Sequence, residues 1–185
     1  MFSDFRHGIF NKNTIEDLVA SIPEGTFKVA DSQVASRWGN IMEFKGFDLI
    51  TPNEREARFA LGDQDSVVRP LATELYNVAR CKTLILKLGE RGILTYRSRP
   101  EGDPRTIISV DSFARNVVDA VGAGDALLAY ASLSLAVSGN EAIASVLGCI
   151  AAGLECEYDG NKTVEPTAIL ERLKQLDCQS RYVVQ

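Results

Sequence analysis

The sequence has little of what metal and nucleophilic catalysis usually require. Its 185 residues include a single histidine, His7, and four cysteines that form no C-x-x-C pair. One histidine excludes a multi-histidine metal site, and a Ser-His-Asp or Cys-His site would have to use His7 itself. Without metal-ligand spacing, free thiols and no structural metal are expected at Cys81, Cys149, Cys156 and Cys178.

The chain also lacks strong positive charge, long apolar runs and an apolar N-terminal segment. Its 20 Lys and Arg against 25 Asp and Glu give a net charge of -5, which offers no electrostatic reason to expect nucleic acid or an anionic membrane as a partner. No run approaches the roughly 18 uninterrupted apolar residues of a membrane span. Residues 1–7 lack the apolar core of a signal peptide, so we expect a cytoplasmic protein. The 45% apolar composition fits one domain over residues 1–185.

Two common nucleotide-binding motifs are missing as well. There is no G-x-x-x-x-G-K-[ST]; residues 160–163, Gly-Asn-Lys-Thr, only look like its end with an asparagine inserted. There is also no G-x-G-x-x-G, so a nicotinamide-dependent oxidoreductase has little support.

What the chain does have is an alternation of strand and helix patterns. Strands are expected at residues 27–31, 47–50, 83–87, 93–96 and 106–110, and helices at 15–21, 53–61, 66–80, 126–137, 141–155 and from 166 onward. No strand is expected before the first helix, which Asn13 or Thr14 would cap. The helix from residue 126 is apolar almost all round and is expected to be buried. The alternation predicts an α/β sandwich around a largely parallel sheet, with a hairpin at residues 83–96.

The most informative feature is an acidic residue in a glycine-rich turn at the start of a helix. Gly122, Ala123 and Gly124 can present consecutive N–H groups to an anion without a side chain in the way. Asp125 follows in the first helical turn, where a carboxylate beside a phosphate could take a proton from an attacking hydroxyl. The preference of Asp for helix N-termini also explains Asp125, but not the two glycines. Asp119 either makes local hydrogen bonds or helps to bind a cation.

A second polar segment follows an expected strand. Thr51 and Glu54 fit a capping box with Pro52 at the first helical position, so helix initiation accounts for those three residues. It does not account for Asn53 and Glu56. These two share a helix face and could reach one metal–phosphate group, although their spacing alone favours an exposed surface.

A third segment, residues 87–92, reads Lys-Leu-Gly-Glu-Arg-Gly. It is the end of an expected strand followed by a glycine turn, and its backbone could approach a nucleotide. Without other evidence, an ordinary hairpin turn is the better interpretation.

Together the three segments resemble the ribokinase/PfkB family of carbohydrate kinases. Residues 119–126 resemble the C-terminal signature of that family, residues 51–57 its N-x-x-E segment, and residues 86–92 its nucleotide loop, in the same order. Residues 29–33 and 44–53 are similar to the sugar-kinase half of bifunctional ADP-heptose synthases. The resemblance implies a ribokinase-like three-layer α/β/α sandwich, truncated at the N-terminal side. The strands that bind sugar and the β-lid would be missing.

The resemblance also implies roles in phosphoryl transfer. Asp125 would be the base that deprotonates a sugar hydroxyl. Gly122, Ala123 and Gly124 would form the anion hole for the transferring phosphate.

The other implied residues bind ATP and ions. Asn53 and Glu56 would act near Mg²⁺ and the phosphates. Asp119 and Gly160 would lie near a monovalent-cation loop, which in some members takes an ion such as K⁺. The residues implied around ATP are Lys87, Gly89, Gly92, Cys149 and Ala152. For Lys87, a direct phosphate contact is a further hypothesis.

Two functions stay open on the sequence. The leading one is an ATP-dependent carbohydrate kinase acting on a hydroxyl of a sugar or sugar phosphate. The alternative is a non-catalytic nucleotide-binding or interaction module, because the sugar-binding half is absent. Sheet surface left exposed by that half also predicts self-association as a homo-oligomer.

Overall fold

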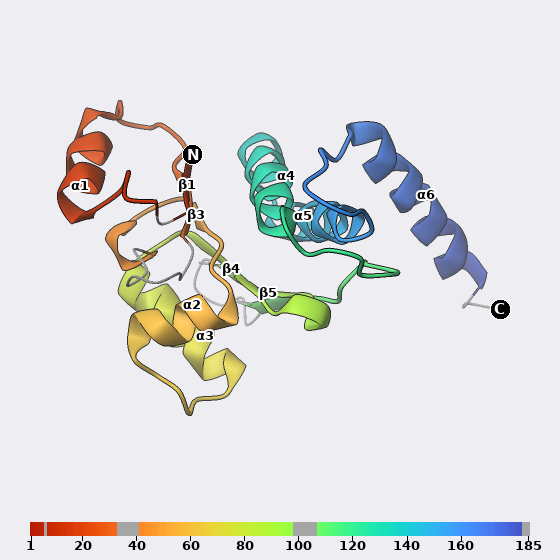
Figure 1. Ribbon diagram of the computed structural model, residues 1–185, viewed down its shortest axis with the longest axis horizontal. Coiled ribbons are helices and arrows are strands. Elements are labelled where there is room, and N and C mark those ends of the chain that lie inside the picture. The colour runs from red at the N-terminus through yellow and green to blue at the C-terminus, as the bar shows by residue number, and fades with distance from the viewer. Residues whose placement is uncertain (6, 33–40, 98–106, 183–185) are drawn as a thin grey trace. The chain divides into compact units, whose positions relative to one another are not determined.

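A mixed sheet of six strands, in the order β1-β2-β3-β4-β5-β6, forms the centre of the first part of the chain. The computed structural model describes residues 1–5, 7–32, 41–97 and 107–182. Gln33 and Thr106, which belong to segments discussed above, lie outside the described residues. The chain divides into two compact units, Met1–Val110 and Asp111–Gln185 (Figure 1).

Parallel pairing joins the first four strands, and the last two are antiparallel to their neighbours. The strands are β1 (Phe2–Asp4), β2 (Val29–Ser32), β3 (Leu49–Ile50), β4 (Thr83–Lys87), β5 (Ile93–Arg97) and β6 (Ile107–Val110). A 3-10 turn, η2 (Gly89–Arg91), joins β4 to β5, which confirms the predicted hairpin.

The strand β1 shows that the expectation of no strand before the first helix is wrong. Phe2 pairs in register with Ala30 of β2. Its ring lies against Phe44 and Phe47, with centroids 5.5 and 5.6 Å apart. Three residues are too few to show an alternating pattern, so tertiary packing rather than local sequence defines this strand.

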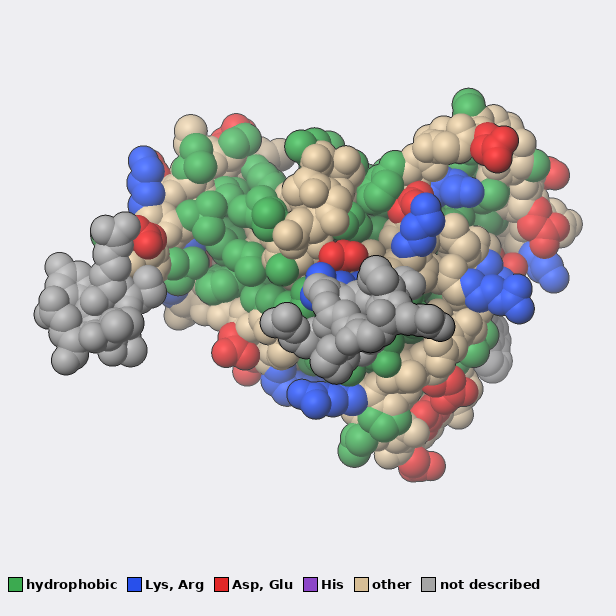
Figure 2. All heavy atoms as spheres, turned by 180° about the vertical axis from the view of Figure 1, so that it is seen from behind, with side chains coloured by type: hydrophobic (Ala, Val, Ile, Leu, Met, Phe, Trp, Pro, Cys, Tyr) green, Lys and Arg blue, Asp and Glu red, His purple; other side chains and the backbone are tan. Residues whose placement is uncertain are grey.

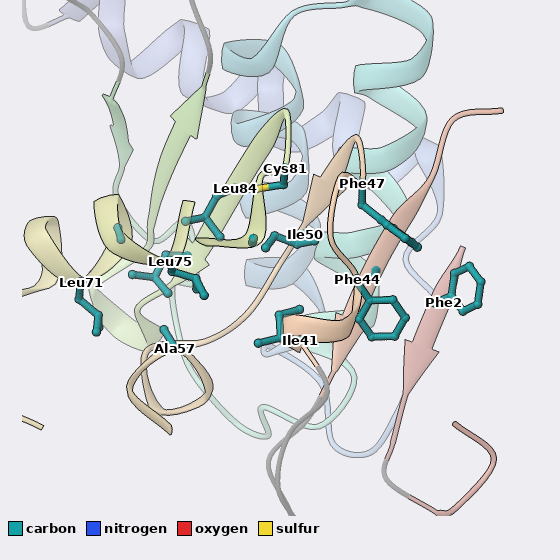
Figure 3. Packing of buried hydrophobic residues seen from close by; sticks show 14 of the residues in the cluster. Phe2, Ile41, Phe44, Phe47, Ile50, Ala57, Leu71, Leu75, Cys81 and Leu84 are labelled. Carbon is teal, nitrogen blue, oxygen red and sulfur yellow. The ribbon is translucent and has the colours of Figure 1, made fainter. Parts of the chain in front are cut away.

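The core of the first unit lies between one sheet face and the helices that follow the strands (Figure 3). Ala30, Ile50 and Leu84 share that face because they are register partners on adjacent strands. Ala57 of α2 (Glu54–Leu61) and Leu75 of α3 (Val68–Ala79) pack into the same cluster and are fully buried. Full burial of each large apolar side chain contributes about 1.5–3 kcal/mol to the stability of the fold. This packing fixes the positions of the strands and of their ends.

The first helix, α1 (Lys12–Ser21), is capped by Asn11 rather than by Asn13 or Thr14. Asn11 Oδ1 accepts a hydrogen bond from Thr14 N at 3.1 Å, and Thr14 Oγ1 accepts one from Asn11 N at 2.8 Å. This reciprocal pair satisfies two backbone donors at once, and it places the start of the helix ahead of the expected position. The 3-10 turn η1 (Ile41–Glu43) lies between β2 and β3.

The second unit contains the helices α4 (Ala123–Ser138), α5 (Glu141–Glu155) and α6 (Pro166–Tyr182). As predicted, Gly139 ends α4 in the left-handed conformation, and the side chain of Asn140 caps α5. A Cβ added at Gly148 of α5 would lie 3.0 Å from Ala131 Cβ and 3.2 Å from Leu127 O of α4. Glycine therefore allows α4 and α5 to pack closely.

Helix α4 is not buried all round, contrary to expectation. Leu127, Leu128 and Ala131 are buried, but Leu133 is 67% exposed and Val137 is 89% exposed. A helix packed against one neighbour buries only the stripe that faces it, whatever the composition of its other side. Figure 2 shows one face of the molecule, on which hydrophobic side chains are exposed alongside charged ones. Within the described residues, every helix is too short or too polar to cross a membrane.

Candidate functional site

In the first unit, polar residues gather at the carboxyl ends of three parallel strands. Asp31 lies near the end of β2, Asn53 follows β3, and Lys87 ends β4. Lys87 and Asn53 form an isolated parallel bridge, and Lys87 N donates to Pro52 O at 2.8 Å. Ligands of open α/β sheets bind at this edge. These three residues, with Glu56 and the turn at residues 89–92, form what we call the strand-edge site.

Asn53 and Glu56 form the capping box of α2, a role that the sequence analysis gave to Thr51 and Glu54. Asn53 Oδ1 accepts from Glu56 N at 2.8 Å, and Glu56 Oε2 accepts from Asn53 N at 2.6 Å. Asn53 Nδ2 also donates to Glu56 Oε1 at 2.6 Å. These reciprocal hydrogen bonds are those of a capping box. Helix initiation therefore does explain both residues.

The spacing of Asn53 and Glu56 favoured an exposed position for both residues. For Glu56 this expectation is wrong, because the residue is only 3% exposed. A buried carboxylate is retained only where hydrogen bonds satisfy it. The capping box supplies those bonds and fixes both Glu56 oxygens at the strand edge.

Glu54 holds the glycine turn to the start of α2. Its Oε1 accepts from Arg58 Nη2 at 2.7 Å, and its Oε2 contacts Arg91 of η2. The hydrogen bond from Arg58 is the main cause that lowers the pKa of Glu54, and Arg91 adds to it against the effect of burial. Gly89 and Gly92 have φ of 62° and 79°, a conformation that other residues rarely adopt.

Asp31 was missed as a site residue, although an acid at a strand end was a visible signal. Its Oδ2 accepts from Lys87 Nζ at 2.8 Å, and the Asp31 and Lys87 side chains are 7% and 16% exposed. Within the described part of the chain, Asp31 Oδ1 and Thr51 Oγ1 are both buried without a hydrogen-bond partner.

In the second unit, the start of α4 has the predicted form. Gly122 is the N-cap, with φ of 89° and no side-chain capping bond, and Asp125 lies in the first turn. Ala123 N donates to Ala120 O at a long 3.3 Å. The first N–H groups of a helix have no partner within it, so this turn is suited to an anion. Gly122, Ala123, Gly124 and Asp125 form what we call the helix-mouth site.

Two side chains that the sequence analysis missed border the helix-mouth site. A Cβ at Gly122 would lie 2.6 Å from Asn161 Oδ1 and 2.7 Å from Glu155 Oε1. Glu155 is 1% exposed, and its Oε1 accepts from Lys162 N at 2.7 Å. Its Oε2 is buried, and no described residue provides it with a hydrogen bond. The signal for Glu155 was a lone acid at the end of the apolar run at residues 148–154.

Asp119 makes the local hydrogen bond that was one of its two interpretations. Its Oδ1 accepts from Val121 N at 3.0 Å, and its own N donates to Cys156 O at 3.2 Å. Gly160 is exposed, with φ of 72°. A cation role for Asp119 and Gly160 stays a prediction.

The residues predicted around adenine lie on α5. Cys149 and Ala152 share a face of this helix, and Cys149 Sγ lies 3.3 Å from Asp111 O as a hydrogen-bond donor. Burial raises the pKa of the Cys149 thiol to about 11, so it is neutral and unsuited to nucleophilic chemistry. The cysteines are free, as predicted. Among the described residues, no group of three or more His, Cys, Asp or Glu side chains could hold a metal ion.

Comparison with known proteins identifies relatives of this chain. The model of the pfkB family of carbohydrate kinases matches residues 10–168. The chain is 29% identical over 174 residues to Bifunctional protein HldE of Geobacter metallireducens, which covers 92% of this chain and 34% of the relative.

Two solved structures share its fold. Phosphofructokinase-2 from Escherichia coli in complex with potassium has a TM-score of 0.75 at 19% identity, covering 91% of this chain and 53% of that one. Arabidopsis thaliana ribokinase complexed with ribose and ATP has a TM-score of 0.66 at 20% identity, covering 79% of this chain and 47% of that one.

These similarities confirm the predicted ribokinase-like α/β fold and the resemblance to bifunctional sugar-kinase proteins. The chain spans about a third of the length of the curated relative, 34%, and 53% and 47% of the two solved chains. Because the family model matches most of the sequence, the chain belongs to the pfkB family of carbohydrate kinases.

Proposed function

We propose that this chain is the ATP-binding and base-carrying part of a kinase that phosphorylates a hydroxyl of a sugar or sugar phosphate. The observation that carries the proposal is the helix-mouth site, where an uncapped Gly122 opens α4 and Asp125 follows in its first turn. Family membership supports the reaction class.

In the proposed reaction, Asp125 accepts the proton of the acceptor hydroxyl. The hydroxyl oxygen then bonds to the γ-phosphorus of ATP, the bond to the β,γ-bridging oxygen breaks, and ADP leaves. Charge on the transferring group would be stabilised by N–H groups of Gly122, Ala123 and Gly124. Their fixed orientation means that little reorganisation accompanies the reaction.

We assign the phosphates of ATP to the strand-edge site, near Asn53, Glu56, Lys87 and the turn from Gly89 to Gly92. Asn53 donates to both oxygens of Glu56, which holds this carboxylate at the carboxyl ends of the strands. The capping box is therefore compatible with a role beside Mg²⁺, which would neutralise phosphate charge when bound. Adenine is assigned to the face of α5 that carries Cys149 and Ala152.

A monovalent cation is proposed beside the helix-mouth site, near Asp119 and Gly160. The buried Glu155 Oε2 has no hydrogen-bond partner in residues 1–5, 7–32, 41–97 and 107–182, and Asn161 Oδ1 adds a second oxygen next to Gly122. Oxygen ligands can replace the hydration shell of K⁺. The similar phosphofructokinase-2 from Escherichia coli has been solved in complex with potassium.

The alternative function is a non-catalytic nucleotide-binding or interaction module. It is favoured by one observation, that the chain covers only 34% of its curated relative. A module of this kind would bind ATP without holding an acceptor.

Calorimetric titration of the 185-residue chain with ATP and Mg²⁺, alongside a coupled assay of ADP release on sugars and sugar phosphates, tests the proposal. Binding with sugar-dependent turnover is the expected result. Binding without turnover on any acceptor would favour the module, and the absence of binding would contradict both.

A further inference from the structure

The Lys87–Asp31 ion pair of the strand-edge site is built differently from an ordinary structural pair. The ammonium lies 2.8 Å from Asp31 Oδ2. The second carboxylate oxygen, Oδ1, is buried and has no hydrogen-bond partner among the residues that the structure describes. A buried charge that lacks hydrogen bonds destabilises the folded state. In an ion pair that serves only stability, both carboxylate oxygens are therefore expected to accept hydrogen bonds.

In the Lys82–Asp48 pair of the same unit, both carboxylate oxygens accept hydrogen bonds. Asp48 Oδ1 accepts from Lys82 Nζ at 2.7 Å, and Asp48 Oδ2 accepts from Lys28 N at 2.6 Å. The Lys82 side chain is 75% exposed. This pair lies at the start of β4, whereas Lys87 ends the same strand.

The sheet register explains how Lys87 reaches Asp31. Ala30 is opposite Ile50, and Ile50 is opposite Leu84, so the row after them contains Asp31, Thr51 and Ile85. Lys87 points to the same face as Ile85, because side chains alternate along a strand. Its ammonium therefore crosses the row of Thr51 on β3 to meet Asp31 on β2.

The ion pair holds the Lys87 ammonium at the carboxyl ends of the parallel strands, where ligands of open α/β sheets bind. Lys87 is the more exposed partner, at 16% against 7% for Asp31. An ammonium has three N–H donors, and the contact with Asp31 Oδ2 uses one of them. Its backbone neighbours are Pro52 and Asn53, at the start of the capping box.

We propose that Lys87 is a direct ligand of the nucleotide phosphates and that Asp31 is the positioning residue that holds its ammonium in place. This inference rests on the proposed function and adds Asp31 to the site. Lysine acts as a compact point charge on phosphate, so its position decides the strength of the contact. With Asp31 as anchor, the four-carbon side chain is ordered before the nucleotide arrives.

The test compares ATP with adenosine, because only ATP carries phosphates. Calorimetric dissociation constants are measured with Mg²⁺ for the wild-type chain, K87M, K87R, D31N and D31E, together with melting temperatures. K82M is the matched control, since it removes the same charge from the other end of β4.

K87M is expected to weaken ATP binding about tenfold or more, the effect of one charge-assisted hydrogen bond, and to leave adenosine within about twofold. D31N is expected to weaken ATP binding about threefold to tenfold, with partial recovery in D31E. K87R and K82M should keep the preference for ATP.

The controls separate positioning from folding. Equal loss of ATP and adenosine binding in D31N or K87M would mean general damage and would overturn the inference. Unchanged ATP binding in K87M would overturn it while leaving the proposed function intact. A wild-type chain that binds neither ligand would overturn the proposed function, and the inference with it.

Discussion

At the residue scale, the helix-mouth site depends on a glycine for two separate reasons. Gly122 has a φ of 89°, which strains other residues, and Asn161 Oδ1 and Glu155 Oε1 occupy the space of a Cβ. Glu155 cannot move freely, because it is buried and accepts from Lys162 N at 2.7 Å. The residues around the proposed anion hole therefore fix its backbone.

Gly122→Ala should destabilise the chain more than Gly139→Ala does. Gly139 has a similar φ of 60°, but no atom of the described residues lies within 4 Å of its Cβ position. The control should cost about 1 kcal/mol for backbone strain, and Gly122→Ala about 1–3 kcal/mol more for the steric clash. Urea unfolding measures both. Equal losses would mean that Asn161 and Glu155 do not crowd Gly122.

Arg172 Nη2 lies 2.7 Å from Glu157 Oε2, and this ion pair should make stability depend on pH. Burial opposes ionisation of Glu157, but hydrogen bonds from Arg172 and Arg115 N outweigh it and lower its pKa from the ordinary 4.5. A lowered pKa adds stability above 4.5 that is lost as the pH falls through the folded value. Between pH 7 and about 3.5, E157Q should therefore lose less unfolding free energy than the wild type does. Identical pH profiles would contradict this.

At the scale of elements, local signals predicted helix ends well where one residue decides them. Gly139, Asn140 and Pro166 end or begin helices as expected. The caps at Asn11 and Asn53 were misplaced because several neighbours had suitable side chains. Only the reciprocal hydrogen bonds of the folded chain select one of them.

The capping box of α2 can be separated from a role of Asn53 in binding. N53A should cost about 1 kcal/mol, while N53S should cost less because serine also caps helices. If the Asn53 amide also acts near the phosphates, N53S should still bind ATP more weakly than the wild type. Unfolding and calorimetry on the same samples provide both values. Wild-type ATP binding by N53S would limit Asn53 to capping.

At the scale of the whole molecule, the family and fold followed from three short segments, but the site contacts did not. The helix-mouth site is local in sequence, so glycine spacing was enough to predict it. The Asp31–Lys87 contact joins residues 56 positions apart, and it depends on the order of β2, β3 and β4. The same holds for Glu155, whose neighbours become apparent only when α4 and α5 are folded.

The whole chain is also predicted to associate with copies of itself. Leu133 and Val137 of α4 are one turn apart and mostly exposed, which is typical of an interaction surface. Sedimentation should show a homo-oligomer, and L133E/V137E should weaken association about tenfold or more at an unchanged melting temperature, from lost apolar burial. A wild-type monomer at high concentration would contradict the prediction.

The central claim is that Asp125 is the base of a phosphoryl transfer. The most direct test is the turnover number of D125N beside E141Q, which removes an acid from the first turn of α5 instead. D125N should lower turnover about 10²- to 10⁴-fold with ATP affinity within about twofold, and E141Q should change neither. Turnover by D125N close to that of the wild type would contradict the claim.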